Sequence, residues 1–481
     1  MLKHTKIVAT ISDERCDVEF LHALYEAGMN VVRLNTAHIS EEGLTRVVEN
    51  TRAVSDRIGI LIDTKGPEVR TTKSNAPIDF KSGDRVKISS DPDAETTREC
   101  IHVSYRNFVA DLEIGSDVLI DDGDLELKVI EKTDGYLVCE AQNDATLGSR
   151  KSVNVPGIRI NLPSLTDKDV KNIEWAIANK LDFIAHSFVR TKQDVLDIQQ
   201  MLDAHCSPIK IIAKIENQEG IDNIDEILKV AYGIMIARGD LGIEVAEEKV
   251  PGIQRVLIRK CVEVKKPVIV ATQMLHTMIK NPRPTRAEVT DIANAIYYRT
   301  DALMLSGETA YGKYPVEAVQ TMTRIIREAE KTKLSANDIR VPISGDDLDV
   351  TSFLAKQAVK SSAKLKVRAI ISDSLTGRTA RYLAAFRGSA TVFAICYRKE
   401  TMRMLSLSYG VWAVYQQWSK SRKGYYYEAL NQLIKRGMIT RNDKVAYLSG
   451  SFGEGGGTTF LEINDVDRVL DAADDYQLPT F

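Results

Sequence analysis

Eight short apolar segments of the chain end in charged, hydroxyl or amide residues, and a helical pattern follows each of them along the chain. Segments of this length and composition are typical of buried strands. Eight strand–helix units predict a (β/α)8 barrel, in which chemistry gathers at the carboxyl ends of the strands. The predicted strands are Lys3–Thr10, Met29–Asn35, Ile58–Asp63, Asp182–Ser187, Ile209–Ile215, Gly233–Ala237, Pro267–Ala271 and Asp301–Leu305.

The spacing of these strand ends reveals an insert. Neighbouring ends lie 24 to 34 residues apart, about one strand–helix unit, but Asp63 and Ser187 are separated by 124 residues. Residues 71–156 carry short alternating stretches divided by turns such as Ser82-Gly83-Asp84. This pattern predicts a small all-β domain, placed at the catalytic rim as a lid, and leaves residues 1–70 and 157–340 to the barrel.

A polar segment, residues 335–349, separates the barrel from a third region. Residues 345–481 alternate strand and helix patterns again, which predicts a C-terminal α/β domain. The predicted strands are Arg368–Ser372, Ala390–Ile395, Val411–Val414, Lys444–Leu448 and Thr459–Ile463. The whole chain is therefore expected to be an α/β protein with three domains.

Composition narrows the possible partners. The net charge is −3 over 481 residues and the basic residues are not clustered, which argues against a nucleic-acid partner. The six cysteines are far apart and show no metal-binding spacing, as expected of reduced thiols. The chain opens without a signal pattern and has no apolar run of about 18 residues, so we expect a cytoplasmic protein without a membrane partner.

Two carboxylates follow neighbouring predicted strands. Lys214 and Glu216 are two residues apart at the end of one strand, and Arg238 and Asp240 repeat that spacing at the end of the next. Residues two apart on a strand share a face, so Glu216 and Asp240 can meet and hold Mg2+ or Mn2+. A neighbouring lysine can neutralise a phosphoryl group or an enolate. The alternative is a structural ion pair of Lys214 with Glu216 or Asp240.

Arginines and hydroxyls suggest oxyanion sites. Arg33 and Arg70 lie on adjacent loops and can form a phosphate clamp, although each can also be an ordinary ion pair. Residues 372–379 combine hydroxyls, a glycine and a predicted helix start, which suits a phosphate; the alternative is an ordinary N-cap at Thr376 or Thr379.

In residues 281–288, Thr285 and Glu288 predict a capped helix start. No P-loop, dinucleotide or hydrolase motif is present.

The chain resembles the pyruvate kinase family over nearly its whole length. Its strongest motif is Ile211-Ile-Ala-Lys-Ile-Glu-Asn-Gln-Glu-Gly220. Further motifs in the family's order are Arg33-Leu-Asn35, Asp63–Arg70, Ala237-Arg-Gly-Asp-Leu-Gly242, Ala271-Thr-Gln-Met274, Asn281–Glu288 and Leu305-Ser-Gly-Glu-Thr-Ala310.

The resemblance implies phosphoryl transfer from phosphoenolpyruvate to ADP in glycolysis, giving pyruvate and ATP. Lys214, Arg33 and Thr272 would be catalytic, and substrate would contact Arg33, Lys214, Gly239, Asp240, Thr272 and Ser306. Glu216 and Asp240 would hold Mg2+ or Mn2+, and K+ would bind Asn35, Asp63 and Thr64. The nucleotide would contact Asn35, His38, Arg70 and Lys151, and a sugar-phosphate effector would contact Ser374, Thr376, Gly377 and Thr379. A homotetramer is the family's usual assembly.

Two departures from the family pattern bear on function. Ala37 stands where the family has a serine that ligates K+, whereas Glu68, which accompanies K+ dependence, is retained. We therefore expect a weakened K+ requirement, with water or Thr36 filling the gap. Ser152 replaces a common glycine beside Lys151, which bears on the lid contact.

Two other functions compete with this interpretation. One is another Mg2+-dependent, enolate-forming barrel lyase or aldolase, which needs no nucleotide lid; Arg70, Lys151 and the insert argue against it. The other is a non-catalytic, ligand-binding relative, which the presence of Lys214, Glu216, Asp240 and Thr272 disfavours.

Overall fold

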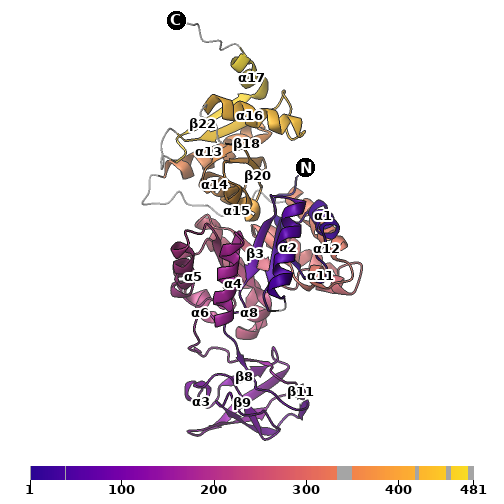
Figure 1. Cartoon of the computed structure of the whole chain (residues 1–481), viewed down its shortest axis with the longest axis vertical. Coiled ribbons are helices and arrows are strands. Elements are labelled where there is room, and N and C mark those ends of the chain that lie inside the picture. Colours follow the sequence, from indigo (N-terminus) through magenta and orange to yellow (C-terminus); the bar gives the residue numbers. More distant parts are fainter. Residues whose placement is uncertain (1, 38, 333–348, 418–421, 451–456, 475–481) are drawn as a thin grey trace.

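The computed structural model describes residues 2–37, 39–332, 349–417, 422–450 and 457–474. Three bodies follow one another along the long axis of the molecule (Figure 1). The barrel lies in the middle, the β-rich insert extends from one end of it, and the C-terminal domain covers the other end. In the part of the chain that the structure describes, no helix is long and apolar enough to cross a membrane.

The barrel is closed by eight parallel strands in the order β1-β17-β16-β15-β14-β13-β3-β2. All eight predicted strands are confirmed, with ends shifted by a few residues. The strands are β1 (Lys6–Ile11), β2 (Val31–Asn35), β3 (Gly59–Asp63), β13 (Phe183–His186), β14 (Lys210–Ile215), β15 (Gly233–Ala237), β16 (Val268–Ala271) and β17 (Ala302–Leu305).

Helices surround the strands, and side-chain caps start several of them, including the cap that the sequence predicted at Thr285. Thr166 and Asp169 form a reciprocal capping box at the start of α4, and Thr285 and Glu288 form another at the start of α10. The barrel helices are α1 (Val18–Ala27), α2 (Glu41–Val54), α4 (Asp167–Ala178), α5 (Lys192–Ala204), α6 (Gln218–Asp222), α7 (Ile224–Val230), α8 (Arg238–Glu244), α9 (Val250–Glu263), α10 (Arg286–Tyr297), α11 (Gly307–Ala310) and α12 (Pro315–Lys331), with short 3-10 turns at Glu247–Lys249 and His276–Ile279.

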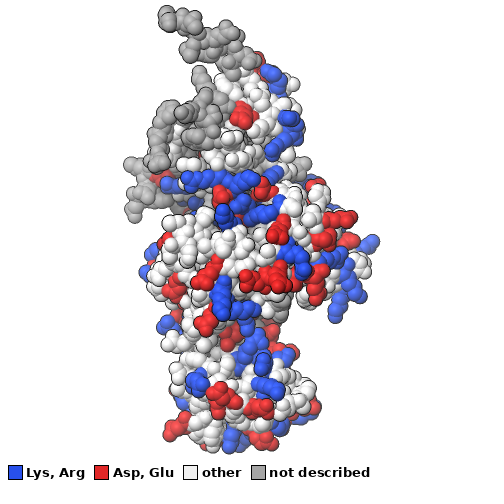
Figure 2. Space-filling view, in the orientation of Figure 1, with Lys and Arg blue, Asp and Glu red and all other residues white. Residues whose placement is uncertain are grey.

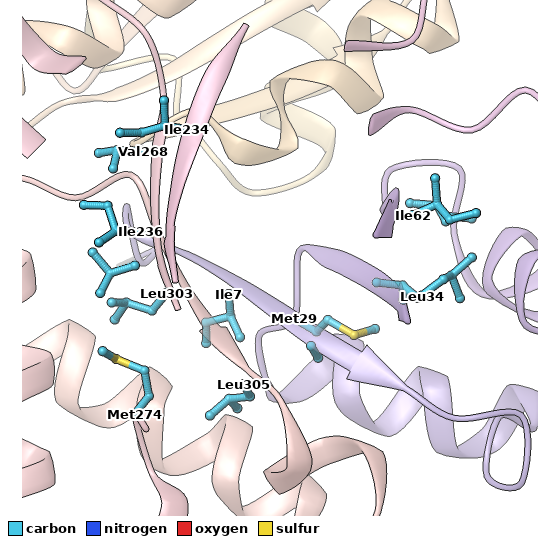
Figure 3. Packing of buried hydrophobic residues seen from close by; sticks show 14 of the residues in the cluster. Ile7, Met29, Leu34, Ile62, Ile234, Ile236, Val268, Met274, Leu303 and Leu305 are labelled. Carbon is cyan, nitrogen blue, oxygen red and sulfur yellow. The ribbon is translucent and has the colours of Figure 1, made fainter. Parts of the chain in front are cut away.

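The barrel strands are apolar on both faces. One set of side chains packs between the strands and the helices; Ile7, Leu303 and Leu305 belong to it (Figure 3). The other set, which includes Val8 and Phe183, fills the barrel interior. Burial on both faces explains why the strands read as continuous apolar runs. Polar residues are consequently confined to the strand ends.

The insert is a mostly antiparallel β structure with its own apolar core, in which β6 and β7 pair in parallel. Its main sheet has the order β4-β12-β8-β9-β10-β6-β7, and β11 pairs with β5. The sheet starts at Val69, because β4 pairs with β12. The elements are β4 (Val69–Arg70), β5 (Ile78–Phe80), β6 (Arg85–Ser89), β7 (Cys100–His102), α3 (Phe108–Asp111), β8 (Asp117–Ile120), β9 (Leu125–Lys132), β10 (Leu137–Ala141), β11 (Ala145–Leu147) and β12 (Ser152–Asn154).

The C-terminal domain is a five-stranded sheet of order β20-β19-β18-β21-β22 with apolar clusters on both faces. The five predicted strands are confirmed; only β22 runs antiparallel. The elements are α13 (Val350–Leu365), β18 (Ala369–Ser374), α14 (Arg378–Ala385), β19 (Thr391–Cys396), α15 (Lys399–Met404), a 3-10 turn (Leu405–Leu407), β20 (Val411–Tyr415), α16 (Arg422–Lys435), β21 (Lys444–Ser449), β22 (Phe460–Asp465) and α17 (Val466–Asp474).

The C-terminal domain plugs the amino-terminal mouth of the barrel. Leu407 is fully buried among the interior side chains of the barrel strands. Ion pairs flank this plug: Asp182 accepts from Arg403 at 2.6 Å, and Arg387 donates to Asp301 at 2.8 Å. The opposite, carboxyl-terminal mouth is left for the candidate site.

Candidate active site

Lys214 is the central cation at the carboxyl end of the barrel. It is the penultimate residue of β14, and 8% of its surface is exposed. Its Nζ atom lies 2.8 Å from Glu216 Oε1 and 3.4 Å from Asp63 Oδ1, and donates to Ser187 Oγ at 2.8 Å. Burial lowers the pKa of this ammonium, but Asp63, Glu216 and Asp240 outweigh burial and raise the pKa well above its usual value. Lys214 is therefore firmly charged.

Arg33 and Asp63 come from neighbouring strands and form a second buried pair. The Arg33 guanidinium contacts Asp63 Oδ2 through both Nε, at 2.8 Å, and Nη2, and it also donates to Thr10 Oγ1 at 3.2 Å. Burial raises the pKa of the Asp63 carboxyl, but Arg33 and Lys214 together hold it below its usual value. Asp63 thus stays ionised and fixes two cations at the rim.

Glu216 is a fully buried carboxylate directly after β14. Its Oε2 atom accepts from the Phe188 backbone N–H at 2.7 Å, and its Oε1 atom pairs with the Lys214 ammonium at 2.8 Å. Burial and the charge of Asp240 together outweigh the effect of Lys214 and raise the pKa of this carboxyl to about 7. Glu216 and the nearby carboxylate of Asp240 are a fitting ligand set for a divalent cation.

The position of Asp240 corrects one prediction. Residues 238–240 do not continue strand β15, as their spacing suggested, but form the first turn of helix α8. The strand ends at Ala237 and the helix begins at once, so Arg238 and Asp240 no longer share a strand face. Asp240 still acts electrostatically on both Lys214 and Glu216, which places it at the same site.

Within the described residues, no group of three or more histidine, cysteine or carboxylate side chains could hold a metal ion. Glu216 and Asp240 offer two protein ligands. Mg2+ commonly binds through one or two carboxylates and completes its coordination with water and substrate oxygens. The residues present therefore fit a divalent ion that is shared with a phosphorylated substrate.

Thr272 lies in a strained turn directly after β16. Its φ is +67° and that of Gln273 is +53°, which is rare for residues other than glycine and most unusual for a β-branched one. Arg238 stabilises this turn by donating to the Thr272 carbonyl at 2.5 Å, and Asp291 pairs with Arg238 at 2.7 Å. The Thr272 hydroxyl is thereby fixed at the rim.

The neighbours of Thr272 at the rim are Gly239 and Ser306. The Gly239 N–H donates to Thr272 Oγ1 at 3.0 Å, and Thr272 Oγ1 donates to the Ala271 carbonyl at 2.7 Å. Ser306 follows β17, and its N–H donates to Glu308 at 2.7 Å. These contacts join the ends of β15 and β16, and order the end of β17.

The predicted monovalent-cation ligands lie beside Arg33 and Lys214. Asn35 Oδ1 accepts from the Ala37 N–H at 3.2 Å, and Ala37 is exposed and supplies no side-chain oxygen. Thr36 donates its hydroxyl to the Asp63 carbonyl at 2.8 Å, so this oxygen is already engaged. The Thr64 carbonyl accepts from Ser187 Oγ at 2.6 Å. His38, a predicted nucleotide contact, lies outside the described residues.

A cleft of about 670 Å³ separates the insert from the barrel rim. Arg70 and Lys151 line it from the insert side, and Asp240 lines it from the barrel side. Arg70 pairs with Glu68 at 2.6 Å and Lys151 pairs with Asp121 at 2.6 Å, so both cations are pre-positioned at the cleft. Arg33 is not among the lining residues, so the two arginines of the predicted clamp contribute to separate parts of the site.

Ser187 is a site residue to which sequence reasoning assigned no role. It is buried, accepts from Lys214, and donates to the Thr64 carbonyl, so it links the central cation to the predicted K+ ligands. Its backbone N–H also donates to Thr64 Oγ1 at 3.0 Å. The available signal was its place directly after a barrel strand, which is typical of functional residues in this fold.

The predicted effector residues lie where β18 is joined to α14: Ser374 ends the strand, and Thr379 lies in the first turn of the helix. Gly377 is the N-terminal residue before α14 with a φ of +78°, so neither Thr376 nor Thr379 caps this helix. Ser374 and Thr379 are buried, and Thr379 Oγ1 lies 2.6 Å from Thr458 Oγ1. Thr376 is exposed.

Comparisons with known proteins agree with this architecture. Residues 2–319 match the family model "Pyruvate kinase, barrel domain", and residues 353–464 match "Pyruvate kinase, alpha/beta domain". A pyruvate kinase of Borreliella burgdorferi is 47% identical over 97% of this chain and 98% of its own length. A Bacillus licheniformis pyruvate kinase is 42% identical over 98% of this chain and 81% of its own length.

The fold agrees as well. The crystal structure of a pyruvate kinase from Cryptosporidium parvum superposes with a TM-score of 0.91, at 37% identity, covering 97% of this chain and 96% of that one. Two models of one family match this chain, and relatives from the same family are similar to it over nearly its whole length. The chain therefore belongs to the pyruvate kinase family.

Proposed function

We propose that the protein transfers the phosphoryl group of phosphoenolpyruvate to ADP, forming pyruvate and ATP in glycolysis. The observation that carries the proposal is the buried group of Lys214, Arg33, Asp63 and Glu216 beside a cleft lined by Arg70 and Lys151. Phosphoryl transfer depends mainly on positioning and on neutralising the charge of the moving group. Fixed cations at a buried rim provide both.

In this proposal each residue has a defined task. Arg33 and Lys214 hold the phosphoryl group, and Lys214 also stabilises the enolate that remains after transfer. Gly239 offers its backbone to the substrate carboxylate, and Asp240 and Ser306 also contact the substrate. Thr272 lies where the enolate is protonated, and its strained backbone keeps the hydroxyl in place. Closure of the insert over the rim would limit access of water to the transferring group.

Glu216 and Asp240 hold a divalent cation, Mg2+ or Mn2+, in the proposed site. When bound, the ion would supply positive charge that offsets the negative charge of the phosphoryl group. Asn35, Asp63 and Thr64 hold K+ more weakly than a complete ligand set, because Ala37 offers no hydroxyl. Asn35, Arg70 and Lys151 contact the nucleotide, and His38 is proposed from the sequence alone.

The domains divide these tasks. We assign catalysis to the barrel, residues 1–70 and 157–340, nucleotide closure to the insert, residues 71–156, and regulation to residues 345–481. Ser374, Thr376, Gly377 and Thr379 are proposed to bind a sugar-phosphate activator. A cytoplasmic homotetramer is proposed from family membership.

A coupled assay for pyruvate tests the function directly. We expect pyruvate to form from phosphoenolpyruvate only when ADP and a divalent cation are both present. Pyruvate release without ADP would instead support a lyase, and no turnover under any condition would support a ligand-binding relative. Addition of sugar phosphates to the same assay tests the effector site, since an unchanged phosphoenolpyruvate saturation curve would contradict activation.

A further inference from the structure

Two segments of chain connect the insert to the barrel, residues 64–69 on the way in and residues 155–165 on the way out. The molecule is narrow at this junction, and side chains of both charge signs lie on its surface there (Figure 2). Arg70 and Lys151, the proposed nucleotide contacts, lie in the insert sheet or next to it, whereas the proposed phosphoenolpyruvate contacts belong to the barrel. The orientation of the insert therefore determines how far apart these two groups of residues lie.

The outgoing segment packs with the insert rather than with the barrel over most of its length. The side chains of Ile158, Ile160 and Leu162 contact the apolar core of the insert. The structure describes all of residues 155–165, and none of them lies in a helix or a strand. The path of this segment over the barrel therefore depends on contacts with barrel side chains and not on a regular backbone pattern.

Arg190 of the barrel binds this segment through its guanidinium. Its Nη1 atom donates to the Leu162 carbonyl at 2.9 Å and to the Ile160 carbonyl at 3.3 Å. The rest of the guanidinium pairs with Asp194, because Nη2 donates to Oδ1 at 3.1 Å and Nε lies 3.5 Å from Oδ2. One planar group thus joins two backbone carbonyls of the segment to a carboxylate of helix α5.

Asp194 is a fixed partner for Arg190. It lies in the first turn of α5, and 6% of its surface is exposed. Its Oδ2 atom accepts from the backbone N–H groups of Arg190, at 2.8 Å, and Thr191, at 3.0 Å. Burial raises the pKa of this carboxyl, but the hydrogen bonds from Arg190 and Thr191 hold it below its usual value. The guanidinium is therefore held in place on the barrel and presents its Nη1 atom to the segment.

The incoming segment meets the same part of the barrel, the chain directly after β13. Gly66 has a φ of +72°, and a Cβ atom at this position would lie 2.8 Å from the Phe188 ring and 3.0 Å from the Ser187 side chain. The Phe188 N–H donates to Glu216, and Ser187 accepts from Lys214. The chain after β13 therefore supports both connections of the insert as well as two charged groups of the rim.

We propose that Arg190 is a positioning residue that holds the outgoing segment on the barrel and thereby sets where the insert places its nucleotide-binding cations. Because Ile160 and Leu162 pack in the insert, a bond to their carbonyls restrains the insert itself. Without the guanidinium, the insert can adopt further orientations, and the nucleotide binds more weakly because the binding-competent orientation is a smaller part of the population. The phosphoenolpyruvate contacts stay in place, since they lie on the barrel. The effect on nucleotide rests on the proposed function, whereas the restraint itself does not.

Trypsin tests the restraint without any catalytic activity. The bond after Arg159 precedes Ile160, whose carbonyl Arg190 binds, and the Arg159 side chain is exposed. In the full chain, Arg190→Met is expected to raise the rate of cleavage after Arg159 about 10-fold or more, because cleavage requires the segment to leave the barrel. Cleavage after Arg441, on the surface of the C-terminal domain, should stay unchanged. Arg190→Lys should give an intermediate rate, since one ammonium cannot bind Asp194 and both carbonyls together.

Arg259→Met is the matched control. Arg259 forms an ion pair of the same four-residue spacing with Glu263 on the exposed surface of helix α9, so its loss should not change cleavage after Arg159. Equal cleavage rates for the unaltered protein and Arg190→Met would overturn the proposal. A parallel rise in cleavage after Arg441 would overturn it as well, because it would show a general loss of stability.

The coupled assay measures the effect on each substrate. We expect Arg190→Met to raise KM for ADP about 10-fold and to change KM for phosphoenolpyruvate by less than about twofold. Equal rises in both KM values, or an unchanged or lowered KM for ADP, would overturn the effect on the nucleotide. If the unaltered protein forms no pyruvate, the proposed function fails, and the cleavage rates still decide whether Arg190 restrains the insert.

Discussion

The two ends of the barrel carry buried lysines in opposite electrostatic states. At the carboxyl end, Lys214 is surrounded by Asp63, Glu216 and Asp240, and its pKa is raised despite burial. At the amino end, Lys6 is similarly buried but has only a carbonyl partner, and burial lowers its pKa to about 7. Both lysines are thus buried, and the number of nearby carboxylates determines whether the pKa of the lysine is raised or lowered.

This difference has a functional meaning. The catalytic rim keeps Lys214 charged because the carboxylates of Asp63, Glu216 and Asp240 surround it. At the other end, Glu330 and Asp301 also favour the charged form of Lys6, but their effect is smaller than that of burial.

Among the variants proposed here, removal of Lys214 should have the largest effect on turnover. Lys214→Ala deletes the fixed charge at the rim, so turnover in the coupled assay should fall by ~10²–10³-fold or more, as for other preorganised charge-stabilising groups. Lys331→Ala is the control, since its ammonium pairs with Glu328 on the exposed surface and should leave turnover unchanged. Near-normal turnover of Lys214→Ala would reject the catalytic role of the rim.

Ser187→Ala should have the next largest effect. The variant removes the oxygen that accepts from Lys214 and the donor to the Thr64 carbonyl, so turnover should fall roughly 10-fold, the cost of one unsatisfied buried group. The half-saturating K+ concentration should rise, and Tl+ binding to the substrate-free enzyme should weaken. Ser362→Ala removes a comparable buried bond to the Ala358 carbonyl and should change neither property. Unchanged cation binding in Ser187→Ala would rule out the proposed link.

Ala37→Ser should produce a smaller change in the opposite direction. A hydroxyl beside Asn35 restores an oxygen ligand, so the half-saturating K+ concentration should fall about fivefold, equivalent to about 1 kcal/mol for one added interaction. Ala37→Gly adds no oxygen and serves as the control. Full activity of the unaltered protein in K+-free buffer would contradict the requirement itself.

Replacement of Lys6 should have the smallest effect, which is a change in how the free energy of unfolding depends on pH. Its folded pKa of about 7 lies below its unfolded value near 10.5, so between these values the unfolded chain binds the additional proton. The free energy of unfolding should therefore gain up to about 1.4 kcal/mol per pH unit from this residue as pH rises from 7 towards 10. Urea unfolding of Lys6→Met should lack this increment. Parallel pH curves for both proteins would show that Lys6 stays charged in the fold.

The sequence predicted the barrel well because its strands are buried on both faces. Polar residues such as Lys214 and Asp63 could then appear only at strand ends, so their gathering at one rim followed from the fold. The position of Asp240 was harder to predict, because helix α8 starts directly at the end of β15. Arg238 and Asp240 therefore lie on a helix, where residues two apart do not share a face as they would on a strand. Where an element ends depends on tertiary contacts that a pattern does not contain.

Other features depend on segments far apart in the chain. Lys6, Arg57 and Trp412 line one cavity although more than 350 residues separate Arg57 from Trp412, and no local pattern indicates their approach. The left-handed backbone of Thr272 likewise depends on Arg238, which lies on a different strand–helix unit. Ser187 was visible as a strand-end residue, but its hydrogen bonds to Lys214 and Thr64 required coordinates.

The most direct test of the rim is to locate its divalent ion. Crystals grown with Mn2+ and measured at the manganese absorption edge should show one strong anomalous peak bridged by the carboxylates of Glu216 and Asp240, beside the Lys214 ammonium. The peak should vanish in Glu216→Gln. Manganese bound elsewhere, or retained between those positions after this substitution, would contradict the catalytic arrangement described for this protein.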